Sequence, residues 1–285
     1  MAINQAQLFD LLTEYRRENW RGIQTLEWQD RVVHSMAAYH EPAILKRIEP
    51  HWKLPQDAKI LDLGSGVGNF VVACRTQGLR AFGVEPDRIG QGSSLTSLRI
   101  ARQRLDSPAF AAAVGEQLPF ADATFDLVVL DQVIEHVSDQ SRVLAEAFRV
   151  LKPGGTMYVA CPNYLRFYEP HYKIWFLPLM PKFLGALYLR LRSRDPVLLN
   201  QLKYTTNSRV RKLLKKVKPE RLVDLNGEDL RGKFNLPGAA IASRKARFVK
   251  QLNRFPWLID PVRSAAFFYV RLREGGCEML AVKEA

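Results

Sequence analysis

Residues 60–70, which read ILDLGSGVGNF, constrain the fold of this chain more than any other segment. A short apolar run leads into three glycines at alternate positions, Gly64, Gly66 and Gly68, and a helical pattern follows. Glycine lets a backbone turn sharply and approach a ligand with no Cβ atom in the way. A strand, a glycine-rich turn and a helix in this order predict a ligand site at the carboxyl end of a parallel strand.

Strand and helix patterns alternate around this segment, which predicts an α/β fold: a mostly parallel sheet with helices on both faces. The N-terminal region reads as helical, because Leu8, Leu11, Leu12 and Tyr15 recur at helical spacing. The expected strands are 58–63, 80–84, 110–114, 125–130, 156–160 and a closing strand at 277–283, and the expected helices are 67–77, 88–105 and one beginning at Ser138 or Asp139. We divide the chain into a helical N-terminal cap (1–55), an α/β core (56–164), a basic aromatic lid or substrate region (165–255) and a C-terminal part that closes the sheet (256–285).

Two acidic residues indicate which ligand the glycine turn holds. Glu85 ends the next strand, about twenty residues on, where a carboxylate can accept both hydroxyl protons of a ribose. A dinucleotide fingerprint would need a glycine where Asn69 stands, and Asp62 lies where pyrophosphate would bind. A carboxylate there favours a ligand with an ammonium group and a sulfonium cation, which is S-adenosylmethionine. The alternative is that Asp62 only ties down the turn.

Several segments together resemble the class I S-adenosylmethionine-dependent methyltransferases, in the branch of ubiquinone and menaquinone biosynthesis methyltransferases and many small-molecule methyltransferases. They cover about 105 residues in the order expected for that family. The matching segments are ILDLGSGVGNF at 60–70, VEPD at 84–87, GEQLPFADATFDLVV at 115–129, IEHV at 134–137 and RVLKPGGTMYVACPN at 149–163. The resemblance implies a Rossmann-like methyltransferase sheet with S-adenosylmethionine as the cofactor.

The resemblance also implies roles for individual residues. The glycine turn would hold the amino-acid end of the cofactor, Glu85 the ribose, the 115–117 turn the adenine, and Asp131 with Gln132 the methionine side. Many relatives carry an aspartate where this chain has Val114, so the adenine contact would come from backbone, Glu116 or Gln117. The expected cofactor residues are Asp62, Gly64, Ser65, Gly66, Gly68, Glu85, Pro86, Gly115, Glu116, Gln117, Asp131 and Gln132.

In methyl transfer the cofactor carries the reactivity, and the protein aligns the acceptor with the methyl group. An oxygen or carbon acid also benefits from a general base. His136 is the first candidate and His171 the second, and the alternative for each is a histidine that packs or bonds locally. Cys74, Cys161 and Cys277 have no metal-ligand spacing, and we expect no metal site.

The net charge of +13 arises in one segment. Residues 165–255 hold 21 Lys/Arg and six Asp/Glu, which indicates an anionic partner or a solvated basic face. Three interpretations stay open: docking on an anionic membrane, binding of nucleic acid, and a helical lid packed on the core. Aromatic residues among aliphatic ones at 174–191, and a basic amphipathic helix at 208–218, favour lipid over nucleic acid.

The expected function is methyl transfer to a small-molecule or lipid-linked acceptor, with an anionic acceptor favoured by the basic segment. An RNA methyltransferase, a binding-only relative and an NAD-dependent dehydrogenase or epimerase are the alternatives. An Asn/Asp/Ser-Pro-Pro-aromatic motif, typical of methyltransferases that act on the amino groups of bases, is absent after strand 125–130. The odd cysteine count and the lack of a leader-like or membrane-spanning run predict a cytoplasmic protein, peripheral at the inner face of the membrane if docking occurs.

Overall fold

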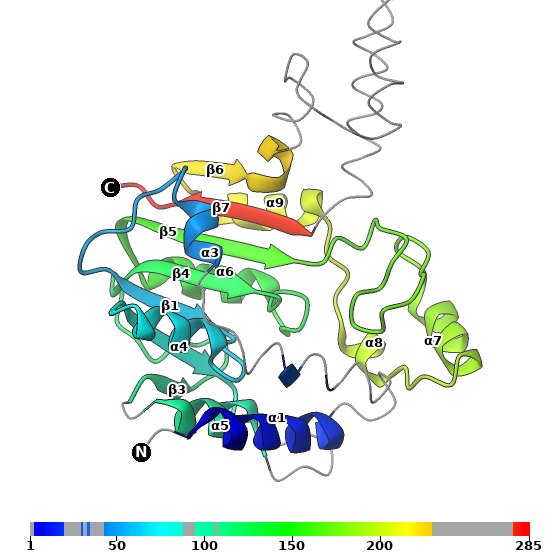
Figure 1. Cartoon of the computed structure of the whole chain (residues 1–285). Helices are drawn as coiled ribbons and strands as arrows, with labels where there is room; N and C mark the ends of the chain where they lie inside the picture. Colours follow the sequence, from blue (N-terminus) through cyan, green and yellow to red (C-terminus); the bar gives the residue numbers. More distant parts are fainter. Residues whose placement is uncertain are drawn as a thin grey trace, which may run out of the picture.

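The computed structural model describes residues 3–19, 30, 33–34, 43–87, 95–105, 108–229 and 276–285. These residues contain one seven-stranded sheet with the order β3-β2-β1-β4-β5-β7-β6 (Figure 1). The strands are β1 (Lys59–Leu63), β2 (Arg80–Glu85), β3 (Phe110–Ala112), β4 (Phe125–Asp131), β5 (Leu151–Cys161), β6 (Arg221–Asp224) and β7 (Cys277–Val282). β7 is antiparallel to β5 and β6, and the other neighbouring pairs are parallel.

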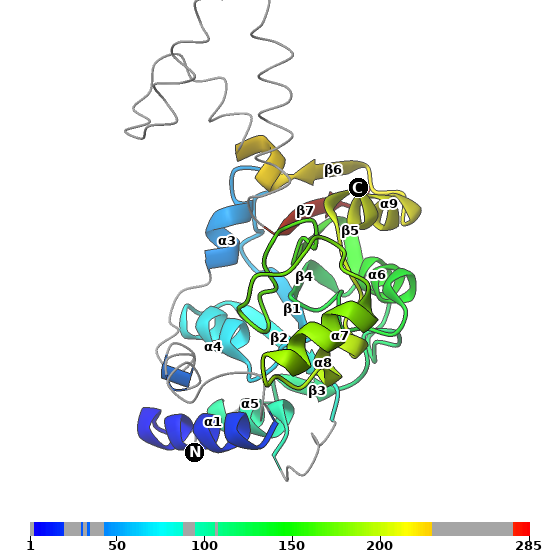
Figure 2. The same cartoon turned by 90° about the vertical axis from the view of Figure 1, so that its right-hand side faces the viewer.

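Helices cover both faces of the sheet (Figures 1 and 2). The described helices are α1 (Gln5–Asn19), α3 (Ala43–Ile48), α4 (Asn69–Thr76), α5 (Ser97–Arg104), α6 (Gln140–Arg149), α7 (Lys182–Leu191), α8 (Val197–Gln201) and α9 (Asn207–Lys216). Asp139 caps α6, because its side chain accepts hydrogen bonds from the backbone N–H groups of Ser141 and Arg142. This confirms one of the two helix starts that the sequence offered.

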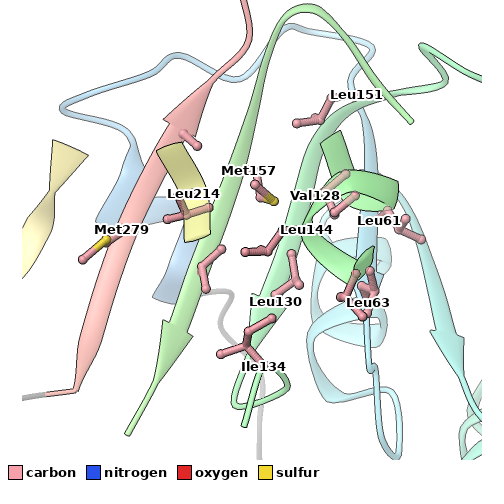
Figure 3. Close-up of a cluster of buried hydrophobic side chains, with 14 of the residues drawn as sticks. Leu61, Leu63, Val128, Leu130, Ile134, Leu144, Leu151, Met157, Leu214 and Met279 are labelled. Atoms are coloured by element: carbon pink, nitrogen blue, oxygen red, sulfur yellow. The ribbon is translucent and has the colours of Figure 1, made fainter. Parts of the chain in front are cut away.

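The strands are apolar on both faces, which is why the sheet is covered on both sides. Successive side chains point to opposite faces, so Leu61 and Val128 pack against α6 and α9, whereas Ile60 and Leu127 pack in the cluster that contains residues of α3, α4 and α5. Figure 3 shows the first of these two clusters, with Leu144 of α6 among the strand residues. The predicted α/β class, mostly parallel with helices on both faces and a helical N-terminus, is confirmed.

Two elements inside the segment 165–255 belong to the α/β layers and not to a lid. α9 buries Val210 and Leu214 in the same cluster as Met279 of β7. β6 pairs along its whole length with β7. The apolar stripe of the basic helix expected at 208–218 therefore packs on the sheet, which agrees with the interpretation of a helical element packed on the core and not with contact between this stripe and lipid.

An insertion at residues 162–206 stands apart from these layers and carries α7 and α8. Its base is closed by hydrogen bonds from the Tyr164 N–H to the Thr205 carbonyl (2.9 Å) and from Thr205 Oγ1 to the Pro162 carbonyl (2.6 Å). It has its own apolar cluster, built from Tyr172, Ile174, Phe176, Leu189 and Leu199. Figure 1 places α7 and α8 on the side of the sheet where the parallel strands end.

Cys74, Cys161 and Cys277 are buried and free, with Cys161 opposite Cys277 in the β5–β7 register. The expected helix at 88–105 is observed from Ser97, and residues 88–94 lie outside the described part of the chain. Within the described ranges, each helix is too short or too polar to cross a bilayer.

Candidate active site

The order of the strands places the site. The chain moves outward in one direction from β1 to β2 and β3, and in the other direction from β4 to β5, so the order reverses between β1 and β4. Ligands in open α/β sheets bind beyond the carboxyl ends of the strands at such a reversal. β1 ends at the glycine turn, β2 ends at Glu85, and β4 ends at Asp131.

The glycine turn is held in a conformation that disfavours other residues. Gly64, Gly66 and Gly68 have φ values of 78°, 52° and 82°. The N–H groups of Gly64 and Ser65 donate to the Val84 carbonyl at 2.8 and 3.0 Å. The Gly66 N–H donates to Glu85 Oε2 at 3.0 Å. The turn after β1 and the carboxylate after β2 are thus joined directly.

Two pockets meet at Gly64. The larger has a volume of about 300 Å³ and is lined by Leu63, Gly64, Gly66, Val84, Glu85, Pro86, Ala113, Val114, Gly115, Glu116, Gln132, Val133, His136, Val137 and Ser138. The smaller has a volume of about 190 Å³ and is lined by Ile44, Asp62, Gly64, Ser65, Asn69, Phe70 and Asp131. Ten of the twelve residues expected to bind the cofactor therefore line one or both pockets.

Three carboxyl groups gather around these pockets, and each of them has a raised pKa. Burial raises the pKa of Asp62 well above its usual value, and the nearby Asp131 and Glu85 raise it further. Burial raises the pKa of Asp131, and it raises that of Glu85 against the opposing effect of the Gly66 hydrogen bond. Carboxylates crowded in this way favour a bound cation, because the cation offsets the repulsion between their negative charges.

Two expected cofactor residues do not line a pocket. A Cβ atom on Gly68 would lie 2.6 Å from the ring of Phe110, so this glycine permits close packing of the turn on β3. Gln117 is exposed, and its N–H donates to the Val114 carbonyl. Glu116 lines the larger pocket, but its Oε1 accepts hydrogen bonds from the N–H groups of Ser138 and Asp139.

The structure brings both expected catalytic histidines together. The rings of His136 and His171 lie 5.2 Å apart in an edge-to-face arrangement. His136 follows β4 and lines the larger pocket, whereas His171 comes from the insertion. Partial burial and the neighbouring His171 lower the pKa of His136 below its usual value.

Two fully buried glutamates accompany the histidines. Glu169 Oε1 accepts a hydrogen bond from His171 Nδ1 at 2.8 Å, and its Oε2 accepts one from the Tyr172 N–H at 2.6 Å. Glu135 Oε1 lies 3.9 Å from His136 Nε2. Burial raises the pKa of Glu135 to about 7. We call Glu135, His136, Glu169 and His171 the acceptor-side cluster.

The sequence alone assigns no role to Glu135, to Glu169 or to Arg104. Glu135 was visible in the IEHV segment, and Glu169 in Glu-Pro-His, but neither pattern reveals that its carboxylate is fully buried. Arg104 of α5 donates to the Val67 carbonyl at 2.8 Å and so supports the glycine turn from a distant helix. Only the tertiary structure shows this contact.

Comparison with known proteins agrees with the site. Residues 61–159 match the family model described as a methyltransferase domain. The chain is 32% identical over 105 residues to a ubiquinone biosynthesis O-methyltransferase of Rhizobium rhizogenes, covering 37% of this chain and 41% of that protein. It is 34% identical over 107 residues to a ubiquinone/menaquinone biosynthesis C-methyltransferase of Pasteurella multocida, covering 35% and 38%. The matches thus span about two fifths of the length of these curated relatives.

Solved structures of methyltransferases overlap more of the chain at lower identity. A Thermotoga maritima protein, titled a possible histamine N-methyltransferase, aligns over 69% of this chain and 80% of its own with 22% identity and a TM-score of 0.45. A Haemonchus contortus phosphoethanolamine N-methyltransferase aligns over 85% of this chain and 52% of its own with 19% identity and a TM-score of 0.49. Residues 61–159 therefore match a methyltransferase domain, and the same segment of the chain is similar to S-adenosylmethionine-dependent methyltransferases of ubiquinone and menaquinone biosynthesis.

Proposed function

We propose that this protein transfers the methyl group of S-adenosylmethionine to a small-molecule or lipid-linked acceptor. One observation carries the proposal: two pockets meet at Gly64, one of them lined by Glu85 and the other by Asp62 and Asp131. The cofactor has the same division, with a ribose and adenine at one end and two cationic groups at the other. The dehydrogenase alternative has no support from the family match.

Each part of the cofactor would have its own set of pocket residues. Asp62 and Asp131 would hold the ammonium group and the sulfonium side, since both line the smaller pocket beside the turn. Glu85 would accept the ribose hydroxyls. Val114 and Gly115 line the larger pocket, so the adenine would lie on apolar surface and take its polar contacts from backbone groups. Glu116 is less suited to that contact, because it holds Ser138 and Asp139.

The acceptor would bind beside His136, at the rim of the larger pocket. Methyl transfer is an in-line displacement in which the acceptor's nucleophile attacks the methyl carbon as the sulfur–carbon bond breaks. His136 and His171 would assist loss of the proton from that nucleophile. The insertion supplies His171, so it would complete the site only when it is docked on the core. One contact that docks it is the hydrogen bond from the Lys203 N–H to the Glu135 carbonyl (2.7 Å).

The test uses S-adenosylmethionine with an isotopically labelled methyl group. The purified protein is incubated with separate panels of phenolic quinone precursors, glycolipids and transfer RNA, and the labelled product is identified by mass spectrometry. Label in a phenol or lipid supports the proposal, and label in RNA would support the alternative acceptor. Cofactor binding without any labelled product or S-adenosylhomocysteine across the panels would favour a binding-only relative.

We further propose that the insertion docks on an anionic membrane surface. Large apolar side chains with exposures of 45–77% gather on and before α7: Trp175, Leu177, Leu179, Phe183, Leu184, Leu187 and Leu191. We call these residues the α7 patch. Lys173, Lys182, Arg190 and Arg192 lie among them in the sequence. Apolar and aromatic residues bordered by cations are typical of surfaces that bind the lipid interface.

The patch lies on the insertion that also carries His171, which would place the acceptor side of the pocket toward the bilayer. Flotation with vesicles of phosphatidylcholine, with and without about 30% phosphatidylglycerol, tests this proposal. Binding to the anionic vesicles alone supports it. Equal binding to both kinds of vesicle, or to neither, would contradict it.

A further inference from the structure

The acceptor-side cluster contains a set of side chains that ligate metals. Glu135, His136 and His171 each offer one ligand atom, and these atoms all lie within 4.8 Å of one another. Within the described part of the chain, this is the one group of three such residues that meets that criterion. The ligands come from two segments, the end of β4 and the insertion, which the fold brings together at the rim of the cofactor pocket.

Glu135 gives independent evidence for a missing partner. Its side chain is fully buried, yet neither carboxylate oxygen has a hydrogen-bond partner among the residues that the structure describes. A buried carboxylate without a partner is costly, whereas one that binds a cation is not. His136 Nε2 lies 3.9 Å from its Oε1, and His171 is a second imidazole neighbour of this carboxylate.

Glu169 completes the arrangement expected around a metal-binding histidine. It is fully buried and accepts a hydrogen bond from His171 Nδ1 at 2.8 Å. Metal-binding histidines almost always donate their second nitrogen to a carboxylate or a carbonyl, which fixes the ring and its tautomer. The carboxylate of Glu169 also accepts from the Tyr172 N–H, so its own position is fixed.

We propose that Glu135, His136 and His171 bind one divalent transition-metal ion, with Glu169 orienting His171. Two imidazoles and one carboxylate favour zinc, iron or manganese over magnesium, which prefers oxygen ligands. An ion at about 2.1 Å from each ligand needs ligand atoms roughly 3.3 Å apart, so the side chains close by about 1 Å when it binds. This departs from the expectation that the chain has no metal site.

The position of the ion assigns it a role that rests on the proposed function. Three protein ligands leave a coordination position open toward the acceptor. An acceptor hydroxyl bound there would give its proton to water more readily, and its oxygen would then attack the methyl carbon as the sulfur–carbon bond breaks. In this arrangement His136 and His171 act on the acceptor through the ion and not as free bases.

The site is tested without an acceptor. The full-length protein is treated with a chelator and titrated with cobalt(II), which reports binding through its visible absorption, and with zinc by calorimetry. We expect one ion per chain at micromolar metal. Glu135→Gln and His171→Asn should abolish stoichiometric binding, and Glu169→Gln should weaken it by about 10- to 100-fold. His136→Asn should also weaken metal binding. Because His136 is exposed, this variant should fold, so that weaker binding cannot be attributed to misfolding.

His51→Asn is the matched control, because His51 also lies beside a carboxylate, 3.5 Å from Glu228, but outside the cluster. It should bind cobalt as wild type does. Absence of binding to the wild-type protein at millimolar cobalt, or equal binding by all the cluster variants, would overturn the proposal. Calorimetry with S-adenosylmethionine is run on the same samples, so that a failure of the cofactor site is detected separately from a failure of the metal site.

Discussion

The backbone N–H of Gly66 donates a hydrogen bond to Glu85 Oε2 at 3.0 Å, which links the turn after β1 to the end of β2. The contact orients the carboxylate beside the pocket, and burial raises its pKa. Glu85→Ala should therefore weaken S-adenosylmethionine binding by about 10- to 100-fold, since two hydroxyl bonds to a charged acceptor are lost. Calorimetry measures the change. Asp57→Asn, at an exposed position before β1, should leave the affinity unaltered.

A second prediction separates backbone strain from close packing in the glycine turn. Gly68 and Gly78 have almost equal φ values, 82° and 80°, but only Gly68 faces a neighbour where a Cβ atom would lie. Gly78→Ala should lower the free energy of unfolding by about 1 kcal/mol, from strain alone. Gly68→Ala should lower it by about 2–4 kcal/mol, because the new atom meets Phe110. Equal losses in chemical denaturation would show that packing on Phe110 contributes nothing.

The raised pKa of Asp62 predicts how cofactor binding depends on pH. Because the pKa of Asp62 is raised in the folded protein, its protonated form stabilises the cofactor-free fold at pH values below the ordinary pKa of an aspartate. This stabilisation is lost as the pH rises through the raised pKa, where Asp62 ionises. A bound cation favours the ionised form, so the affinity for S-adenosylmethionine should increase as the pH rises from about 5 to 7. The thermal shift produced by the cofactor measures this.

Asp62→Asn removes the titrating group and is the control for that prediction. The variant should give a smaller thermal shift that changes little over the same pH range. S-adenosylhomocysteine, which lacks the sulfonium charge, should show a weaker pH dependence than the methyl donor in the wild-type protein. A shift in the wild type that is the same at both pH values would contradict the electrostatic role of Asp62.

The two basic helices of the region 165–255 should behave differently toward lipid. Replacing Trp175, Phe183 and Leu191 together by serine should lower binding to anionic vesicles at least about tenfold, because these side chains are exposed and free to enter the interface. Charge reversal at Lys212, Lys215 and Lys216 should have a smaller effect, since the apolar stripe of α9 packs on the sheet. The reverse order in a flotation assay would assign docking to α9.

His136 gives a kinetic prediction once an acceptor is found. His136→Asn should lower kcat by about 10²- to 10⁴-fold, the range of a lost proton-transfer or electrophilic group. Its exposed position at the pocket rim predicts that the cofactor affinity stays within about threefold of wild type. A variant with wild-type turnover would remove His136 from the reaction.

The sheet, and the gathering of most of the expected cofactor residues around two pockets, could be predicted because their signals are local. The strand, glycine turn and helix at 60–70 lie in one continuous segment, and Glu85 follows at the end of the next strand. The alternation of apolar segments with helical patterns was enough to predict the α/β class. Ten of the twelve expected cofactor residues line the pockets for the same reason.

The pairing of strands that lie far apart in the sequence could not be predicted. β6 is only four residues long and follows a run of lysines, so nothing local distinguishes it from a loop, and its pairing with β7 bridges more than fifty residues. The amphipathic pattern of α9 is the same whether its apolar stripe meets lipid or a sheet. The acceptor-side cluster likewise depends on burial of Glu135 and Glu169, which follows from how the insertion docks on the core.

Titration calorimetry with S-adenosylmethionine and, separately, with NAD(H) determines which cofactor the glycine turn binds. We expect micromolar binding of S-adenosylmethionine to the wild-type protein, binding that is about 10- to 100-fold weaker in Glu85→Ala, and no binding of NAD(H). Binding of NAD(H) in place of S-adenosylmethionine would contradict the assignment of the glycine turn and the proposed function that depends on it.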